Sequence, residues 1–158
     1  MERKEIVNIS DYYLMKAELD KEAGKILASQ GLYSQAIYFE LQYMEKFIKS
    51  EICKKINIEN KYTHELVNKH SIKELIFFLI DIIVVNKTFN IQLKSQIEEI
   101  LGRIDYNKLH NNLRYPYYSP KNKIFIHVEY NKKDYEQIVN ESFEQLKNYI
   151  SNLYKISM

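Results

Sequence analysis

Apolar residues recur at every third or fourth position from about Leu32 to Ile56, a spacing typical of one face of an α-helix. The members of this stripe are Tyr33, Ile37, Leu41, Met44, Ile48 and Ile52. A flanking row widens the apolar surface to well over half of the circumference, and its members are Ala36, Phe39, Tyr43 and Phe47. Such a helix either lies at the centre of a bundle or is shared with a second chain.

A second helical segment precedes it, from about Asp11 to Gln30, with Ser10 in position to cap the first turn. Gly31 follows directly, where a helix commonly ends with a residue in the left-handed conformation. Because this connection is so short, the two helices are predicted to form an antiparallel hairpin.

Further helices are predicted in the rest of the chain. A short helical turn is expected over 63–66, and Ser71-Ile-Lys-Glu74 has the form of a capping box before a helix that reaches about Asn86. Other helices are expected over 90–104, over 106–113 and from about Asp134 onwards. The seam of the last helix alternates steps of four and three, which suits packing against one other helix. Its members are Tyr135, Val139, Ser142, Leu146, Tyr149 and Leu153.

Both prolines of the chain, Pro116 and Pro120, interrupt the helical pattern before the last helix. Beyond them, the alternation of residues over 123–130 fits either a short strand or an extended loop. The predicted fold class is therefore all-α: an up-and-down bundle of five to six helices, with this one short segment left open. Residues 1–158 are predicted to form a single domain.

Composition adds limits on partners and location. The chain has 158 residues, of which 46% are hydrophobic and 28% charged, and its net charge is only +2. Nucleic-acid binding would therefore need a local basic patch. Cys53 is the only cysteine, which excludes an intramolecular disulfide and favours a reducing, cytoplasmic setting. The longest apolar run, over 75–85, is too short to span a bilayer, so no membrane contact is predicted.

Arg114 and Tyr115 directly precede the first proline and are the leading candidates for ligand binding. A guanidinium suits bidentate contact with a phosphate and also stacks on aromatic rings. The alternative is an arginine that pairs with Glu45 or ties the proline loop to a helix. Lys46 and Lys49 share the polar face of the 32–56 helix with Glu45. This group is either a phosphate-facing patch or an ordinary solvated face with weak salt bridges.

His110 lies four residues before Arg114, so on a helix both side chains point to the same side. It is the candidate for a catalytic base, and a surface histidine near a helix end is the alternative. The histidines lack metal-ligand spacing, and no metal ion or other cofactor is predicted. Glu40 and Asp81 are interpreted as buried structural carboxylates, with a tyrosine as the expected hydrogen-bond donor to Glu40.

Three motifs follow one another along the chain. They are Ala28-Ser-Gln-Gly31-Leu-Tyr33-Ser-Gln-Ala36-Ile-Tyr-Phe39, then Gln42-Tyr-Met-Glu45-Lys46-Phe-Ile-Lys49-Ser50, and finally Leu113-Arg114-Tyr115-Pro116. In this order and spacing they resemble the HEPN family (higher eukaryotes and prokaryotes nucleotide-binding domain). The likeness is greatest to the prokaryotic and archaeal branch related to the C-terminal domain of sacsin, and it covers about Asp11 to Leu153.

This resemblance implies a helical bundle that commonly dimerises, and a role in nucleotide binding, RNA cleavage or toxin–antitoxin pairs with a small nucleotidyltransferase. Ribonuclease members carry a histidine shortly after the arginine, whereas here the next histidine after Arg114 is His127. We therefore predict a homodimeric module that binds a nucleotide or RNA phosphate and does not cleave RNA. The alternatives are a metal-independent endoribonuclease toxin that uses His110, and a subunit that covers a nucleotidyltransferase.

Overall fold

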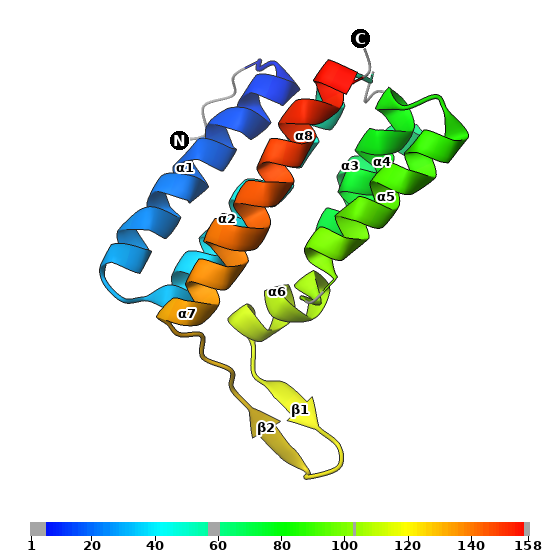
Figure 1. Ribbon diagram of the computed structural model, residues 1–158. Helices are drawn as coiled ribbons and strands as arrows, with labels where there is room; N and C mark the ends of the chain where they lie inside the picture. The colour runs from blue at the N-terminus through cyan, green and yellow to red at the C-terminus, as the bar shows by residue number, and fades with distance from the viewer. Residues whose placement is uncertain (1–5, 57–60, 103, 157–158) are drawn as a thin grey trace.

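The computed structural model describes residues 6–56, 61–102 and 104–156, and it confirms the predicted all-α helical bundle (Figure 1). None of the described helices is long and apolar enough to cross a membrane. The longest helices lie side by side along the bundle, and a small hairpin of two strands projects from one end.

The first two helices form the predicted antiparallel hairpin. Helix α1 (Ile9–Ser29) is capped by Asn8, whose side chain accepts a hydrogen bond from a backbone N–H of the first turn, so the expected cap at Ser10 is wrong. Ser10 instead lies buried against α2. Gly31 has a φ of 77°, a left-handed conformation that suits glycine because it lacks a Cβ atom. Helix α2 then runs over Tyr33–Cys53.

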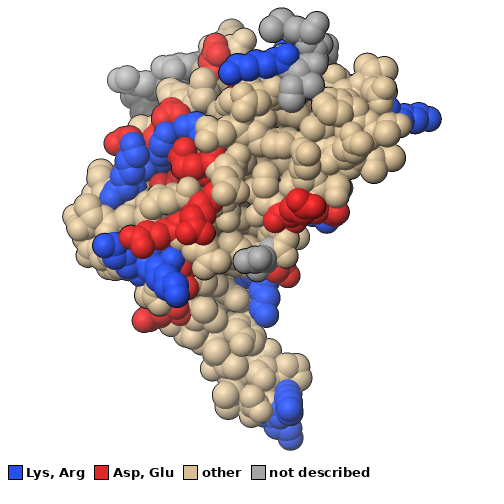
Figure 2. Space-filling model, in the orientation of Figure 1, with Lys and Arg blue, Asp and Glu red and all other residues tan. Residues whose placement is uncertain are grey.

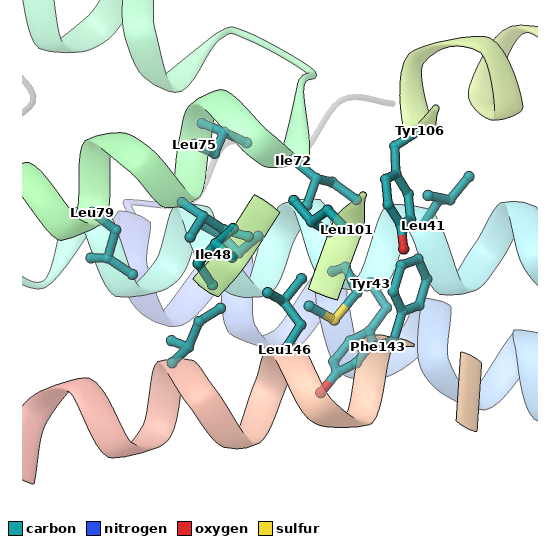
Figure 3. Packing of buried hydrophobic residues seen from close by; sticks show 14 of the residues in the cluster. Leu41, Tyr43, Ile48, Ile72, Leu75, Leu79, Leu101, Tyr106, Phe143 and Leu146 are labelled. Atoms are coloured by element: carbon teal, nitrogen blue, oxygen red, sulfur yellow. The ribbon is translucent and has the colours of Figure 1, made fainter. Parts of the chain in front are cut away.

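Helix α2 lies at the centre of the bundle, as its wide apolar surface predicts. It packs against α1 along its length and also against α4 (Ile72–Ile83), α6 (Tyr106–Arg114) and the C-terminal helix. Figure 3 shows how its side chains meet residues of these helices in one apolar core. The α2 residues that are fully buried there are Ile37, Met44, Ile48 and Ile52.

Helix α4 packs against one side of α2, and the helix that follows it packs against α4 and the C-terminal helix. Helix α3 (Lys61–Val67) leads into α4. The Ser71 side chain caps α4 by accepting from the Glu74 backbone N–H at 3.4 Å, which confirms the Ser71 half of the predicted capping box. Helix α5 (Lys87–Leu101) begins three residues earlier than expected because Asn86 caps it. The interpretation of Asp81 as buried is wrong, since its side chain is exposed on the outer face of α4.

After α6 the chain forms a hairpin of β1 (Tyr117–Ser119) and β2 (Ile124–Ile126). The strands are antiparallel, and Tyr118 pairs with Phe125. The segment over 123–130 thus contains a strand, and its partner is the stretch between the two prolines. A β-partner explains why this alternation forms a strand in a helical protein.

The C-terminal helix has three parts: α7 (Lys132–Tyr135), the π-helix η1 (Glu136–Phe143) and α8 (Glu144–Ile156). Asn131 caps it in a capping box with Asp134, so the helix begins at Lys132, two residues before the predicted start. A π-helix shifts the register of the side chains that follow, because its hydrogen bonds join residues five apart. Three members of the predicted seam are buried, namely Val139, Leu146 and Leu153, whereas Tyr135, Ser142 and Tyr149 are only half-buried. The other buried residues of this helix are Ile138, Phe143 and Ile150.

Candidate functional site

Arg114 ends α6, and its side chain is exposed beside the base of the hairpin. Tyr115 has extended backbone angles (φ −141°, ψ 145°), which a residue before proline favours, and these angles end the helix. The guanidinium lies over the Tyr115 ring, with its Cζ atom 5.1 Å from the ring centroid. Its Nη2 atom also donates a hydrogen bond to the Tyr115 hydroxyl at 3.1 Å. The cation is therefore held in place by an aromatic neighbour.

Arg114 forms no ion pair with any carboxylate of the described residues. The alternative in which it pairs with Glu45 is wrong, since that carboxylate contacts Lys49 and His70 instead. A guanidinium keeps its charge at every physiological pH and offers a planar fork of donors. The Arg114 guanidinium is thus exposed to solvent without a carboxylate partner among the described residues.

His110 lies one helical turn before Arg114 and is half-buried against α2. Its ring centroid is 5.9 Å from that of Tyr38, and its Nε2 atom is 3.3 Å from the Gln42 amide nitrogen. Burial, and then the positive charge of Arg114, lower the pKa of His110 below its ordinary value of 6.5. An amide nitrogen can only donate, so in this geometry the imidazole is neutral and accepts at Nε2.

Glu45 and Lys49 form a buried ion pair one turn apart on α2, with Nζ and Oε1 at 2.7 Å. Their relative exposures are only 5% and 4%. His70, in the loop between α3 and α4, approaches the same carboxylate oxygen with Nδ1 at 2.9 Å. The two buried charges of Glu45 and Lys49 neutralise each other. This pair is therefore part of the interior and is not exposed to a ligand.

Lys46 bonds to the Asp20 carboxylate of α1. The prediction that Lys46, Lys49 and Glu45 share one open polar face is therefore wrong. Helix α1 covers one part of that face, and the His70 loop meets the other. The structure brings Arg114 and Tyr115 together, whereas the three predicted α2 residues are paired with other partners.

Two members of the site were not predicted as functional. Gln42 lies three residues before Glu45, so the sequence places both on one face of α2. That spacing is a usable signal, but nothing local joins Gln42 to His110, which is 68 positions away. His70 reaches Glu45 only through tertiary packing, and the sequence holds no signal for this contact.

Glu40 is buried on another side of α2, where it lies against Gly24 of α1. The expected hydrogen bond from a tyrosine is not formed with any residue that the structure describes, and the nearby Tyr43 hydroxyl also lacks a partner there. Burial raises the pKa of Glu40 from 4.5 to about 7, against the opposing charge of Lys21. Within the described ranges, no three potential ligands among His, Cys, Asp and Glu side chains gather as a metal site.

A hollow beside α6 lies on its other face and has a volume of about 370 Å³. Its lining includes Lys108, Asn112, Tyr130 and Asp134. On a helix with 3.6 residues per turn, Lys108 and Asn112 point away from His110 and Arg114. The Arg114 surface is thus open and not the mouth of this hollow.

No model of a known protein family matches the chain, and neither a curated protein nor a solved structure matches it. The function is therefore inferred from the chemistry of the residues.

Proposed function

We propose that the surface formed by Arg114 and Tyr115 binds the phosphate of a nucleotide or of RNA, and that it does not cleave RNA. One observation carries this proposal: the guanidinium is exposed, fixed over an aromatic ring and has no carboxylate partner among the described residues. Such a cation suits bidentate contact with a phosphate, while the ring offers a surface to a base. The resemblance to the HEPN family adds independent support.

The contact between His110 and Gln42 argues against cleavage. Metal-free cleavage of RNA needs a general base that can reach the proton of the attacking hydroxyl. The lone pair at Nε2 of His110 already accepts from the Gln42 amide, and the remaining nitrogen then carries a proton. We infer that His110 supports the Arg114 turn through α2.

Thermal melts test the binding directly. Saturating ligand at about 100 times its Kd stabilises the folded state by about 2.7 kcal/mol. For a chain of this size that corresponds to a rise of roughly 5–10 °C in the melting temperature. We expect such a rise with ATP, GTP or a short RNA for the wild type.

The Arg114→Ala variant should lose this rise while its own melting temperature stays unchanged, because the side chain is exposed. Lys87→Ala, which removes one exposed cation on α5, is the matched control and should respond like the wild type. A ligand-induced rise that is equal in Arg114→Ala and wild type rejects the proposal.

The second candidate, a metal-independent endoribonuclease, is favoured by the neutral state of His110 beside Arg114. Incubation of the metal-stripped protein with labelled RNA separates the two. Cleavage that disappears in His110→Ala supports the nuclease, and intact RNA supports the binding module. A homodimer and a nucleotidyltransferase partner stay predictions from the resemblance, and the molar mass in solution checks the first.

A further inference from the structure

The β1–β2 hairpin exposes aromatic and apolar side chains that the bundle leaves uncovered. The Tyr118 and Phe125 rings face each other across the strands with their centroids 5.3 Å apart. Phe125 is 72% exposed and Tyr118 is 50% exposed. Figure 1 shows that the hairpin projects beyond the end of the helices. Rings that stay exposed add little to the stability of a two-stranded hairpin. Their exposure on a projecting segment therefore indicates a surface that binds a ligand.

The charge of this segment points to a polyanion. Residues 114–128 contain three basic residues, Arg114, Lys121 and Lys123, and no Asp or Glu. The net charge of the whole chain is +2, so the remaining residues together carry −1 (20 basic against 21 acidic). Figure 2 shows the lysines at the tip of an otherwise uncharged projection. The excess of basic over acidic residues thus lies on the hairpin and its base.

The turn of the hairpin holds a lysine where its backbone is unfavourable. Lys123 has a φ of 54°, which makes it a non-glycine residue in the left-handed region. Glycine and asparagine adopt this conformation most readily, whereas lysine does so at a cost in free energy. A strained lysine at an exposed tip is consistent with a role for its charge.

We propose that the hairpin is a stacking platform for single-stranded RNA that continues from the Arg114 phosphate site. This inference rests on the proposed function and names its substrate class: the ligand is a polymer. Arg114 lies at the base of the hairpin and the lysines lie in its turn, at opposite ends of β1, whose three residues rise by about 10 Å at roughly 3.3 Å per residue. A polymer can follow this length from the phosphate site to the tip. Aromatic rings with flanking cations form the usual surface for single strands.

Fluorescence anisotropy with a labelled 12-nucleotide single-stranded RNA tests the platform in the full chain. Phe125→Ala should weaken binding by roughly 5- to 150-fold, the range for one lost stack of a base on an aromatic ring. Ile91→Ala removes an equally exposed apolar side chain on α5 and should bind like the wild type. Both variants should keep the wild-type melting temperature, because both side chains are exposed.

The lysines are tested by the dependence of binding on salt. The double variant Lys121→Gln/Lys123→Gly removes both charges and also relieves the left-handed backbone at position 123. It should lower the slope of log affinity against log salt by about 1.4, or about 0.7 for each phosphate contact. If the double variant keeps the wild-type slope of log affinity against log salt, Lys121 and Lys123 do not contact phosphates.

The failure of the platform and that of the phosphate site are distinguishable. RNA binding that Arg114→Ala abolishes but Phe125→Ala leaves unchanged overturns the platform and keeps the phosphate site. Binding that Phe125→Ala weakens but Arg114→Ala leaves unchanged supports the platform and overturns the phosphate site. If the wild type does not bind the 12-mer, or binds a dinucleotide equally well, the platform is rejected.

Discussion

The carboxyl group of Glu40 lies buried between α1 and α2, and its titration gives a pH dependence to the stability of the bundle. An ideal Cβ atom at Gly24 would lie 3.2 Å from Oε1 of Glu40, so glycine at this position makes room for the carboxyl group. Burial raises the pKa of Glu40 from 4.5 to about 7 in the folded protein. The folded state therefore holds the Glu40 proton more tightly than the unfolded state does.

The sign and size of the effect follow from this difference. The stability contributed by the protonated carboxyl is fully present below pH 4.5 and is lost as the pH rises through 7. At 1.36 kcal/mol per pKa unit, the loss amounts to about 3 kcal/mol. Glutamine has a similar shape and does not titrate. The free energy of unfolding of Glu40→Gln, relative to that of the wild type, should therefore rise by about 3 kcal/mol between pH 4.5 and 8.

Urea unfolding followed by circular dichroism at several pH values measures this gain. Glu141→Gln replaces an exposed carboxylate on the same bundle and is the matched control, for which the difference from wild type should stay constant with pH. A difference between Glu40→Gln and wild type that is also independent of pH would refute the reasoning. A difference that shrinks with rising pH would refute its sign.

Two further predictions concern the site. Lys49→Met leaves the Glu45 carboxylate buried without its main partner and should lower the free energy of unfolding by about 3 kcal/mol. Lys46→Met breaks a less buried pair and should cost clearly less in the same urea titration, so equal losses would contradict the assignment. The His110 ring should titrate below pH 6.5 in NMR spectra, because burial and then Arg114 lower its pKa. Arg114→Gln should move that pKa upwards, and an unmoved value would remove Arg114 as a cause.

The sequence predicted the helices well, because their apolar periodicity is a local signal. The stripe of α2 is buried as expected from Ile37 to Ile52, and Gly31 lies in the turn between α1 and α2. The strand β1 was missed because three residues between two prolines are too short to show a pattern. The seam of the last helix was predicted in part: Val139, Leu146 and Leu153 are buried, but the π-helix, which no local pattern indicates, lies where Phe143 and not Ser142 is buried.

The candidate site was predicted in part, for a physical reason. Arg114 and Tyr115 are neighbours in sequence, so their contact needs no tertiary information. Whether Lys46 and Lys49 face solvent depends on what packs against α2, and α1 and the His70 loop supply that cover. Spacing along one helix shows which side chains share a face, but it does not show what covers that face.

The buried pair on α2 explains why Arg114 is free to bind an anion. Glu45 acts on the charge state of His110, so the carboxylate lies within electrostatic reach of the α6 turn. Lys49 already neutralises it at 2.7 Å, and His70 occupies the same oxygen. The Glu45 carboxylate thus has its partners inside the bundle, and the Arg114 guanidinium at the end of α6 is exposed to solvent beside the hairpin.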